Sequence, residues 1–407
     1  MKVLIINTFA EGTSTAKIAT GLYQQLIEDG HECRLLYGAG EDCGNKDFHR
    51  ISTDFDLKLH WFFNQITGIH GGLSLFSMKR VIREIEEYEP DVVQLFNLHY
   101  YYLDIAKLFS YLKSKKLPIV YSMLDEYPYL GYCCYAYDCN QYITGCKACD
   151  YKRFRKEYPR NMFWNGAPKT IKLKEKAYAD YRSLVFTGPK WVLERAEKSY
   201  LLKGKRLVEI DEFIDTDNVF VPRKTDKLRE SFGIPEENKV ILNVAPSSDP
   251  RKGVAFYLKV AELCQKENIT FIHVGYQGDA DNVPPNFVPI PFVKDQALLA
   301  EYYSIADLFV CTSLADTMPN VCLDAMACGT PVAGFDITGV PYVAEAPIGT
   351  FVKAKDVQAL TEVCLNAERK KEDTIKQCRE YALSRYSPRV FYKKVKQIYD
   401  ELLLERE

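Results

Sequence analysis

Continuous apolar runs and longer amphipathic stretches alternate along the first half of the chain. Four runs have the length and composition of buried parallel strands, at 3–8, 33–37, 91–96 and 117–123. The stretches between them have helical periodicity, and the first, 16–29, is followed by Gly30, a residue typical of helix C-termini. Strands that alternate with helices in this way predict a doubly wound parallel α/β sheet.

The same alternation begins again in the second half. Four further apolar runs are interspersed with helical stretches, at 239–244, 269–274, 308–312 and 331–335. Because 407 residues are too many for one compact α/β unit, we expect two Rossmann-like domains that face each other across a cleft. The predicted limits are 1–208 for the first domain, 209–387 for the second, and 388–407 for a C-terminal helix that packs back on the first domain.

Composition removes several classes of protein. With 47% hydrophobic and 27% charged residues and a net charge of −2, the chain has neither the bias of a disordered protein nor an overall nucleic-acid signature. The first residues lack the apolar core and cleavage site of a secretory signal, which argues against a periplasmic binding protein. Thirteen cysteines without such a signal indicate a reducing compartment, so we expect a cytoplasmic location. Neither half has GxGxxG after its first strand, which disfavours a nicotinamide site.

The first chemically informative segment is ILNVAPSSDPRKGVAFYL. A predicted strand ends at 244, and Ser247 and Ser248 lie in the turn that follows. Arg251 and Lys252 then precede Gly253 at the start of a predicted helix. Two cations beside a helix N-terminus form an anion site through both charge and dipole, since Arg forks two phosphate oxygens and Lys supplies a point charge. The alternative interpretation is a solvated basic turn.

The second segment is SLADTMPNVCLDAMACGTPVAGFD. Pro319 suits the first position of a helix, and the turn before it leaves backbone N–H groups for an anion or sugar hydroxyls. Asp316 precedes that turn, and Asp324 lies about two helical turns further on. An acidic residue at that place can accept paired hydrogen bonds from a ribose diol. The alternative is a helix with two surface carboxylates.

These motifs resemble those of the retaining glycosyltransferases of family 4, which have the GT-B fold. The likeness rests on RKG at 251–253, PNVCLDAMACGTPV at 319–332, FDITGVPYVAE at 335–345 and FVKDQALLAEYYSIADLFVCTS at 292–313. The Glu-x7-Glu motif of that family corresponds here to Asp316-x7-Asp324. In the first half, DVVQLFNLHYYY and VYSMLDEYPYLGYCCYAYDC resemble a bacterial subgroup that builds surface polysaccharides. The resemblance covers nearly the entire chain.

The resemblance implies a role for each matching residue. Arg251 and Lys252 neutralise the donor diphosphate, Asp324 holds the ribose hydroxyls, and Asp316 positions the transferred sugar. The remaining donor-side positions are Gly12, Thr13, Ser247, Ser248, Gly253, Phe292, Val293, Thr317, Met318, Pro319 and Asn320; among them Phe292 and Val293 adjoin the base, and Gly12 and Thr13 close over the diphosphate from the first domain. His99 and Asp125 are the acceptor-side candidates.

The implied activity is hexosyl transfer from a UDP- or GDP-sugar to a saccharide acceptor, lipid-linked and destined for a surface polysaccharide. The resemblance implies retention at the anomeric carbon and no catalytic metal, with Arg, Lys and helix N-termini stabilising the leaving group. Two alternatives keep the fold: a sugar-nucleotide epimerase or hydrolase, and a non-catalytic binding subunit.

The chain departs from the family pattern at three places. Leu124 replaces the histidine of the subgroup's Thr-Leu-His-Asp, both acids of the Glu-x7-Glu pair are shortened to Asp, and the hinge reads DEFID at 211–215. All three changes bear on the donor sugar and on activity itself, and Leu124 favours the non-catalytic alternative.

Five of the thirteen cysteines lie within 133–149. Four of them give the spacing C-x5-C-x6-C-x2-C, namely Cys133, Cys139, Cys146 and Cys149. The final C-x2-C is the chelating turn of many structural zinc sites, and four thiolates make a closed tetrahedron. Structural zinc is one interpretation, and reduced thiols or a disulfide are the others.

A basic and aromatic segment follows the cysteines. From 151 to 206 there are sixteen Lys or Arg against five Asp or Glu, interleaved with Phe163, Trp164 and Trp191. A solvated basic surface and peripheral contact with the anionic inner face of the cell membrane are both consistent with this composition. The apolar stretch 61–76 is either core or the neighbouring apolar contact. No motif supports nucleic-acid binding.

Overall fold

The computed structural model describes residues 1–74, 76–154 and 163–405. The chain divides into two compact units, Met1–Glu212 with Phe391–Glu407, and Phe213–Val390. The first limit falls four residues after the predicted one, and the division places most of the C-terminal helix with the first unit. No helix among the described residues is long and apolar enough to cross a membrane.

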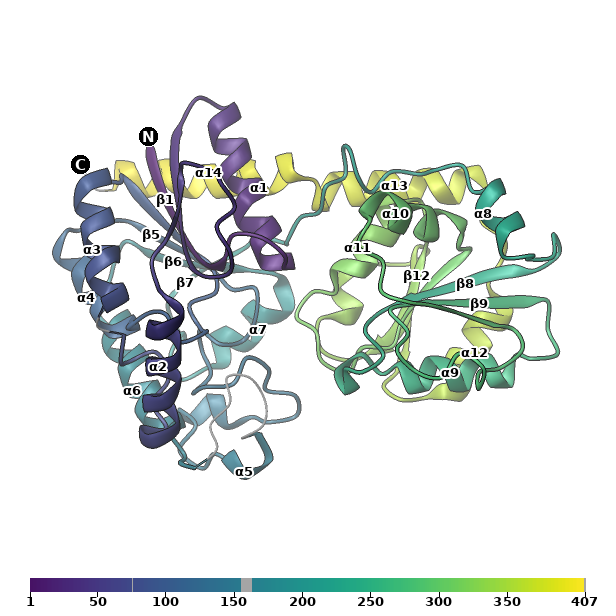
Figure 1. Cartoon of the computed structure of the whole chain (residues 1–407), viewed down its shortest axis with the longest axis horizontal. Coiled ribbons are helices and arrows are strands. Elements are labelled where there is room, and N and C mark those ends of the chain that lie inside the picture. The colour runs from purple at the N-terminus through teal and green to yellow at the C-terminus, as the bar shows by residue number, and fades with distance from the viewer. Residues whose placement is uncertain (75, 155–162, 406–407) are drawn as a thin grey trace. The chain divides into compact units, whose positions relative to one another are not determined.

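The first unit is built on a seven-stranded sheet with the order β3-β2-β1-β4-β5-β6-β7, in which neighbouring strands are parallel (Figure 1). Its strands are β1 (Lys2–Phe9), β2 (Glu32–Ala39), β3 (Phe48–Arg50), β4 (Val92–Leu95), β5 (Ile119–Ser122), β6 (Leu184–Gly188) and β7 (Arg206–Glu209). Its helices are α1 (Ser14–Glu28), α2 (Asp54–Thr67), α3 (Phe76–Tyr88), α4 (Ile105–Ser114), α5 (Tyr151–Phe154), α6 (Ala167–Tyr178) and α7 (Lys190–Lys198), with a 3-10 turn η1 (Gln141–Thr144).

The second unit has a six-stranded parallel sheet in the order β10-β9-β8-β11-β12-β13. Its strands are β8 (Lys239–Val244), β9 (Ile269–Val274), β10 (Phe287–Ile290), β11 (Leu308–Cys311), β12 (Val332–Asp336) and β13 (Gly349–Lys353). Its helices are α8 (Asp226–Ser231), α9 (Val254–Leu263), α10 (Gln296–Ile305), α11 (Asn320–Ala327), α12 (Val357–Asn366) and α13 (Glu372–Tyr386), with 3-10 turns η2 (Pro250–Lys252) and η3 (Val340–Val343). Two parallel α/β sheets of this kind confirm the predicted fold class.

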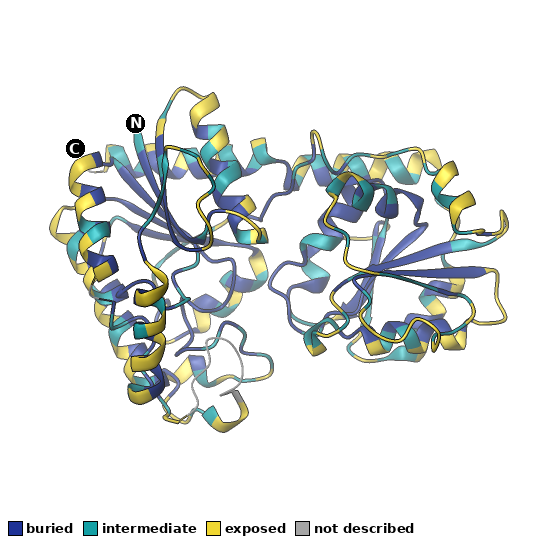
Figure 2. Ribbon diagram, in the orientation of Figure 1, coloured by how far each residue is buried: buried dark blue, intermediate teal, exposed yellow. Residues whose placement is uncertain are grey.

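Each central strand is mostly apolar and mostly buried because both of its faces are covered. In β8, Val240 and Leu242 pack into one buried cluster while Ile241, between them, packs into another. Successive side chains of a strand point to opposite faces, so helices on both sides require a continuous apolar run. Figure 2 shows the resulting buried strands under partly exposed helices.

The last helix, α14 (Pro388–Leu404), buries an apolar stripe at helical spacing that includes Val395, Tyr399 and Leu402. The Tyr399 hydroxyl donates a hydrogen bond of 2.8 Å to Oε1 of Gln94 in β4. Arg206 at the start of β7 forms an ion pair of 3.0 Å with Glu405, just beyond the helix. These contacts join the C-terminal helix to the sheet of the first unit.

Candidate functional site

The predicted donor-side cations and acids gather at one point of the second sheet. β8 and β11 are neighbours in this sheet, and the strand order reverses between them. In open α/β sheets, ligands bind outside the carboxyl ends of the strands at such a switch point. Lys252 follows β8 and Asp316 follows β11, so the fold brings the two sequence motifs together there.

Lys252 and Asp316 form the central ion pair of this site. The Lys252 Nζ lies 2.9 Å from Oδ1 and 2.8 Å from Oδ2 of Asp316, and both side chains are largely buried. Burial alone lowers the pKa of the Lys252 ammonium, but the Asp316 carboxylate outweighs burial and raises it. The lysine is therefore a fixed cation rather than part of a solvated basic turn.

Arg251 is held by the turn that precedes it. Its guanidinium Nη2 lies 2.7 Å from Oδ2 of Asp249, whose other carboxylate oxygen accepts the Arg251 backbone N–H at 2.9 Å. Gly253 follows with a left-handed φ of +62°, and a Cβ there would lie 2.2 Å from the carbonyl oxygen of Thr312. Only glycine allows this approach of the β8 loop to the β11 loop.

A third loop, which follows β12, holds the backbone of Asp316 through hydrogen bonds. The Asp316 N–H donates to the hydroxyl of Thr338 at 3.2 Å, and the Gly339 N–H donates to the Asp316 carbonyl at 2.8 Å. A Cβ on Gly339 would lie 1.7 Å from the carbonyl oxygen of Thr317. Our assignment from sequence omitted Asp249, Thr338 and Gly339, although Thr338 and Gly339 lie in the quoted FDITGV string directly after a strand.

Asp324 lies on α11 and is also largely buried, with 8% of its surface exposed. Burial, followed by the nearby Asp324 carboxylate, raises the pKa of Tyr303 on α10. Both acids of the Asp-x7-Asp pair are thus enclosed, and the alternative of two surface carboxylates is wrong. Pro319 is the N-cap of α11, which begins at Asn320, so the expectation that Pro319 is the first helical residue is off by one position.

The other donor-side candidates of the second unit are more dispersed. Thr317, Met318 and Pro319 are buried in the loop before α11. The hydroxyl of Ser247 accepts a hydrogen bond of 2.8 Å from the Gln277 N–H, whereas Ser248 is exposed. Beyond the edge strand β10, Phe292 is 71% exposed and Val293 packs against the core.

In the first unit, Gly12 and Thr13 follow β1 at the switch point of that sheet. Gly12 has a φ of +79° with open space around it. The Thr13 side chain caps α1 by accepting the Ala16 N–H at 3.1 Å, so the helix begins two residues earlier than predicted. This cap gives Thr13 a structural role that the sequence analysis did not assign.

His99 and Asp125 meet after the neighbouring strands β4 and β5. The His99 Nε2 lies 2.7 Å from Oδ2 of Asp125, whose other oxygen accepts the Tyr127 N–H at 2.9 Å. Burial lowers the pKa of the adjacent Lys174 to about 7, and Cys134 and Asp125 oppose that shift. Leu124, which stands where the subgroup has histidine, is buried, and its side chain is apolar.

Two groups of side chains are candidates for metal binding. Among the described residues, three ligand atoms come within 4.8 Å of one another only at His99, Asp125 and Cys134. Lys174 is buried near Asp125 and Cys134, and its protonated form, present in part at a pKa of about 7, disfavours a second cation there.

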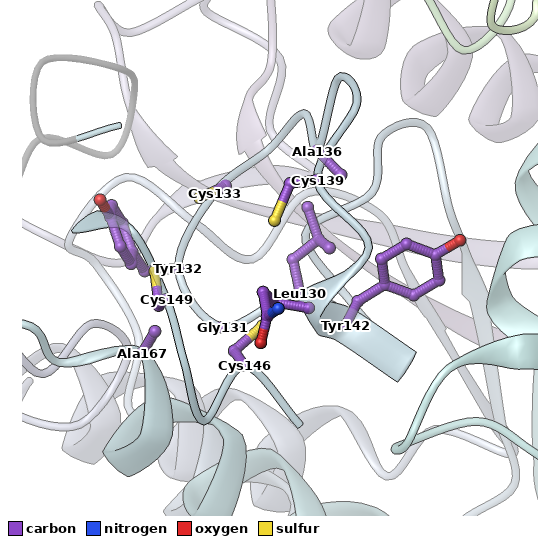
Figure 3. Close-up of a pocket in the computed structure, with 11 residues that line it drawn as sticks. Leu130, Gly131, Tyr132, Cys133, Ala136, Cys139, Tyr142, Cys146, Cys149 and Ala167 are labelled. Atoms are coloured by element: carbon purple, nitrogen blue, oxygen red, sulfur yellow. The ribbon is translucent and has the colours of Figure 1, made fainter. Parts of the chain in front are cut away.

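The four predicted zinc ligands instead line one small cavity of about 20 Å³. They are Cys133, Cys139, Cys146 and Cys149, and Figure 3 shows the labelled residues around that space. All four are free thiols, and burial together with the neighbouring cysteines raises the pKa of Cys133 and, to about 12, that of Cys149. The cysteines share a cavity, but no three of their sulfurs lie within 4.8 Å of one another.

The basic segment 151–206 is described except for residues 155–162, which lie outside the described residues, as does position 75 in the apolar stretch 61–76. Phe163 and Trp164 are exposed, and so are most of the lysines of α6. The apolar residues of α2 within 61–76 are also exposed, so that part of the stretch is not core.

Residues 238–368, which contain the switch-point site, match the protein family described as "Glycosyl transferases group 1". A D-inositol 3-phosphate glycosyltransferase 2 of Catenulispora acidiphila is 28% identical over 170 residues, which cover 37% of this chain. The match spans only 40% of that relative's own length.

Solved structures resemble the whole chain. A sucrose-phosphate synthase from Thermosynechococcus elongatus has a TM-score of 0.67 at 15% identity, with 99% of each chain covered. The Anabaena protein HepE, solved with UDP-glucose, has a TM-score of 0.62 at 14% identity, covering 98% of this chain and all of HepE. The chain thus has the two-domain fold of these glycosyltransferase structures, and residues 238–368 of its second half match the group 1 glycosyltransferase family.

Proposed function

We propose that this protein transfers a hexosyl residue from a nucleotide sugar to a saccharide acceptor, with retention at the anomeric carbon. The observation that best supports this proposal is the site at the switch point of the second sheet. There, three loops hold Arg251, Lys252 and Asp316 at fixed positions beside the N-terminus of α11. A site that is rigid before substrate arrives stabilises a developing charge without reorganisation.

The donor diphosphate is the ligand that this charge pattern fits. Lys252 and Arg251 are each paired with one internal carboxylate, and a diphosphate offers more negative charge than either. When the donor binds, both cations exchange some of their hydrogen bonds to carboxylate oxygens for hydrogen bonds to phosphate oxygens. Pro319 caps α11 without a side-chain acceptor, so backbone N–H groups of the first turn remain for the substrate.

The acids have complementary tasks. Once Lys252 contacts phosphate, the Asp316 carboxylate accepts hydrogen bonds from the transferred sugar together with the loop at 317–320. Asp324, enclosed one helical turn further on, accepts the ribose hydroxyls. Ser247, Ser248, Gly253, Phe292 and Val293 are assigned to the same donor, as are Gly12 and Thr13.

In the reaction, the bond between the anomeric carbon and the phosphate oxygen breaks and a bond to the acceptor oxygen forms on the same face of the sugar. The acceptor hydroxyl gives its proton to the departing diphosphate, whose charge Arg251 and Lys252 neutralise. We assign acceptor contacts to the His99–Asp125 pair of the first unit, and we propose a lipid-linked saccharide of a surface polysaccharide as the acceptor.

Incubation of the protein with a panel of UDP- and GDP-sugars tests this function. The UDP-sugars are tested first, because HepE, a protein of the same fold, was solved with UDP-glucose. We expect nucleoside diphosphate release that depends on a saccharide acceptor, and a product whose anomeric configuration by NMR equals that of the donor. Turnover that is equally fast without acceptor would indicate an epimerase or hydrolase. Donor binding with no turnover for any acceptor would indicate a binding subunit.

We also propose that the four-cysteine loop binds structural zinc. The cavity that the four thiols line is small and otherwise apolar, and the pairing of thiolates with Zn²⁺ removes the cost of burying them. The sulfurs would draw together around the ion. Metal analysis of the purified protein measures this directly.

A further inference from the structure

Helix α2 of the first unit fully buries only polar residues and exposes most of its apolar ones. The buried positions are Asp56, His60, Asn64 and Gln65. The exposed apolar residues are Phe55, Trp61, Phe62, Phe63 and Ile66, with Trp61 at 47%, Phe62 at 52% and Ile66 at 51% exposure, whereas Leu57 packs against the core. A surface helix ordinarily buries its apolar stripe and exposes its polar one, so this arrangement is reversed. Figure 2 shows the exposed side running along α2.

Specific hydrogen bonds fix the helix in this orientation. The Asp56 carboxylate pairs with Arg80 at 2.7 Å and closes a capping box with Thr53 at the helix N-terminus. His60 shares a hydrogen bond with the Ser74 hydroxyl. Rolling the helix to bury its apolar side would break these contacts and bring aromatic rings against polar partners. These buried contacts therefore hold the aromatic side of α2 toward the solvent.

The segment that leads into α6 contacts the end of α2 and carries exposed aromatic residues of its own. A Cβ on Gly166 would lie 1.2 Å from the carbonyl oxygen of Gly68, directly after α2, so the two segments touch. The His70 N–H also donates to the Thr170 hydroxyl of α6 at 3.3 Å. Two residues before Gly166, Trp164 is 60% exposed. We call the set Trp61, Phe62, Phe63, Ile66, Phe163 and Trp164 the aromatic face.

Exposed lysines lie on α2 itself and on α6, the helix that follows Trp164, and we call them the cationic border. Lys58 is exposed on α2, and Lys169, Lys172 and Lys176 are exposed on α6. A lysine stem can lie along apolar surface while its ammonium stays in water.

We propose that the aromatic face inserts into the headgroup region of an anionic lipid bilayer, with the lysines of α2 and α6 against the lipid phosphates. Trp and Phe on one side of a helix and basic residues beside them match the chemistry of a helix that lies in the membrane interface. A contiguous exposed apolar patch marks an interaction site, and the cationic border selects a negatively charged surface. The inference rests on the proposed function and deepens it, because a lipid-linked acceptor resides at such a surface.

Cosedimentation with vesicles tests the contact. We expect the wild-type protein to bind vesicles of phosphatidylglycerol and phosphatidylcholine, and to bind pure phosphatidylcholine at least tenfold more weakly. The triple variant Trp61→Ser, Phe62→Ser, Ile66→Ser should lose at least tenfold in vesicle binding. The matched control Leu263→Ser, Leu365→Ser removes two exposed apolar side chains of the second unit and should bind as the wild type does.

The cationic border has its own variant. Lys169→Ala with Lys172→Ala should weaken binding by about fivefold for each lysine, and added salt should remove that difference. Circular dichroism of each variant checks that the fold is kept. Equal binding to neutral and anionic vesicles, or a triple variant that binds like the wild type, would overturn the proposal.

Two further measurements separate this inference from the proposed function. Transfer to a soluble saccharide acceptor should survive in the triple variant, since the aromatic face is distinct from the donor site. Wild-type transfer without vesicle binding would overturn the membrane contact alone, whereas vesicle binding without transfer would overturn the proposed function alone. A dimer in analytical ultracentrifugation that the triple variant abolishes, together with no vesicle binding, would assign the aromatic face to a second copy of the chain.

Discussion

The two cations of the donor site have acidic partners at very different distances along the chain. Arg251 pairs with Asp249, two positions earlier in the same turn. Lys252 pairs with Asp316, 64 positions away, because β8 and β11 are neighbours in the sheet although β9 and β10 lie between them in the chain.

Gly253 provides a residue-scale prediction with a matched control. Gly253→Ala places a Cβ 2.2 Å from the Thr312 carbonyl oxygen in a left-handed conformation, whereas Gly233 has nearly the same φ, +61°, with open space around it. We expect Gly233→Ala to cost about 1–2 kcal/mol in unfolding free energy from the backbone conformation. Gly253→Ala should cost about 1–3 kcal/mol more from the clash. Urea denaturation of both variants measures the difference, and equal costs would contradict the close approach of the two loops.

Periodicity along the sequence did not reveal which way α2 faces, and it missed several strands. The apolar residues of α2 suggested core or a membrane contact, and a pattern cannot say which way a helix faces. That depends on partners distant in sequence, such as Arg80 for Asp56. The four edge strands, β3, β7, β10 and β13, were not predicted either, because they are short and mostly half-buried or exposed and so lack a continuous buried run. Nor was β6, although all of it is buried.

His60, on α2, makes the stability of the protein depend on pH. Burial lowers the pKa of its imidazole to about 4, below the 6.5 of the unfolded chain, so the unfolded state binds more protons between these values. Its contribution to stability is present above pH 6.5 and is lost as the pH falls toward 4. We expect the wild type to lose up to about 1.4 kcal/mol per pH unit more than His60→Gln in this window. Denaturation of both proteins at several pH values checks this, and parallel pH profiles would contradict it.

The cysteine loop is the second element-scale case. We expect one zinc per chain by elemental analysis, and its loss in Cys149→Ser, whereas Cys43→Ser, which changes a cysteine outside the cavity, should keep it. Chelation should lower the thermal stability of the wild type and leave that of Cys149→Ser unchanged. A purified wild type free of metal, with the same stability before and after chelation, would leave the four thiols as reduced core residues.

For the whole molecule, strand–helix alternation predicted the two parallel sheets because the central strands other than β6 form recognisable apolar runs. The alternation could not predict the order of the strands in each sheet, because the chain crosses from β10 back to β11 beside β8. The site exists because of this crossover. The central claim concerns the molecule's activity: the cations at the switch point stabilise a departing nucleoside diphosphate.

The most direct test compares Lys252→Ala with Lys259→Ala, an exposed lysine of α9 paired with Glu262, in acceptor-dependent release of nucleoside diphosphate from the donor sugar. We predict that Lys252→Ala lowers the turnover number about 10²- to 10³-fold, because a cation that stabilises the leaving group is lost, and that Lys259→Ala has little effect. A Lys252→Ala protein that turns over donor at the wild-type rate would contradict the account.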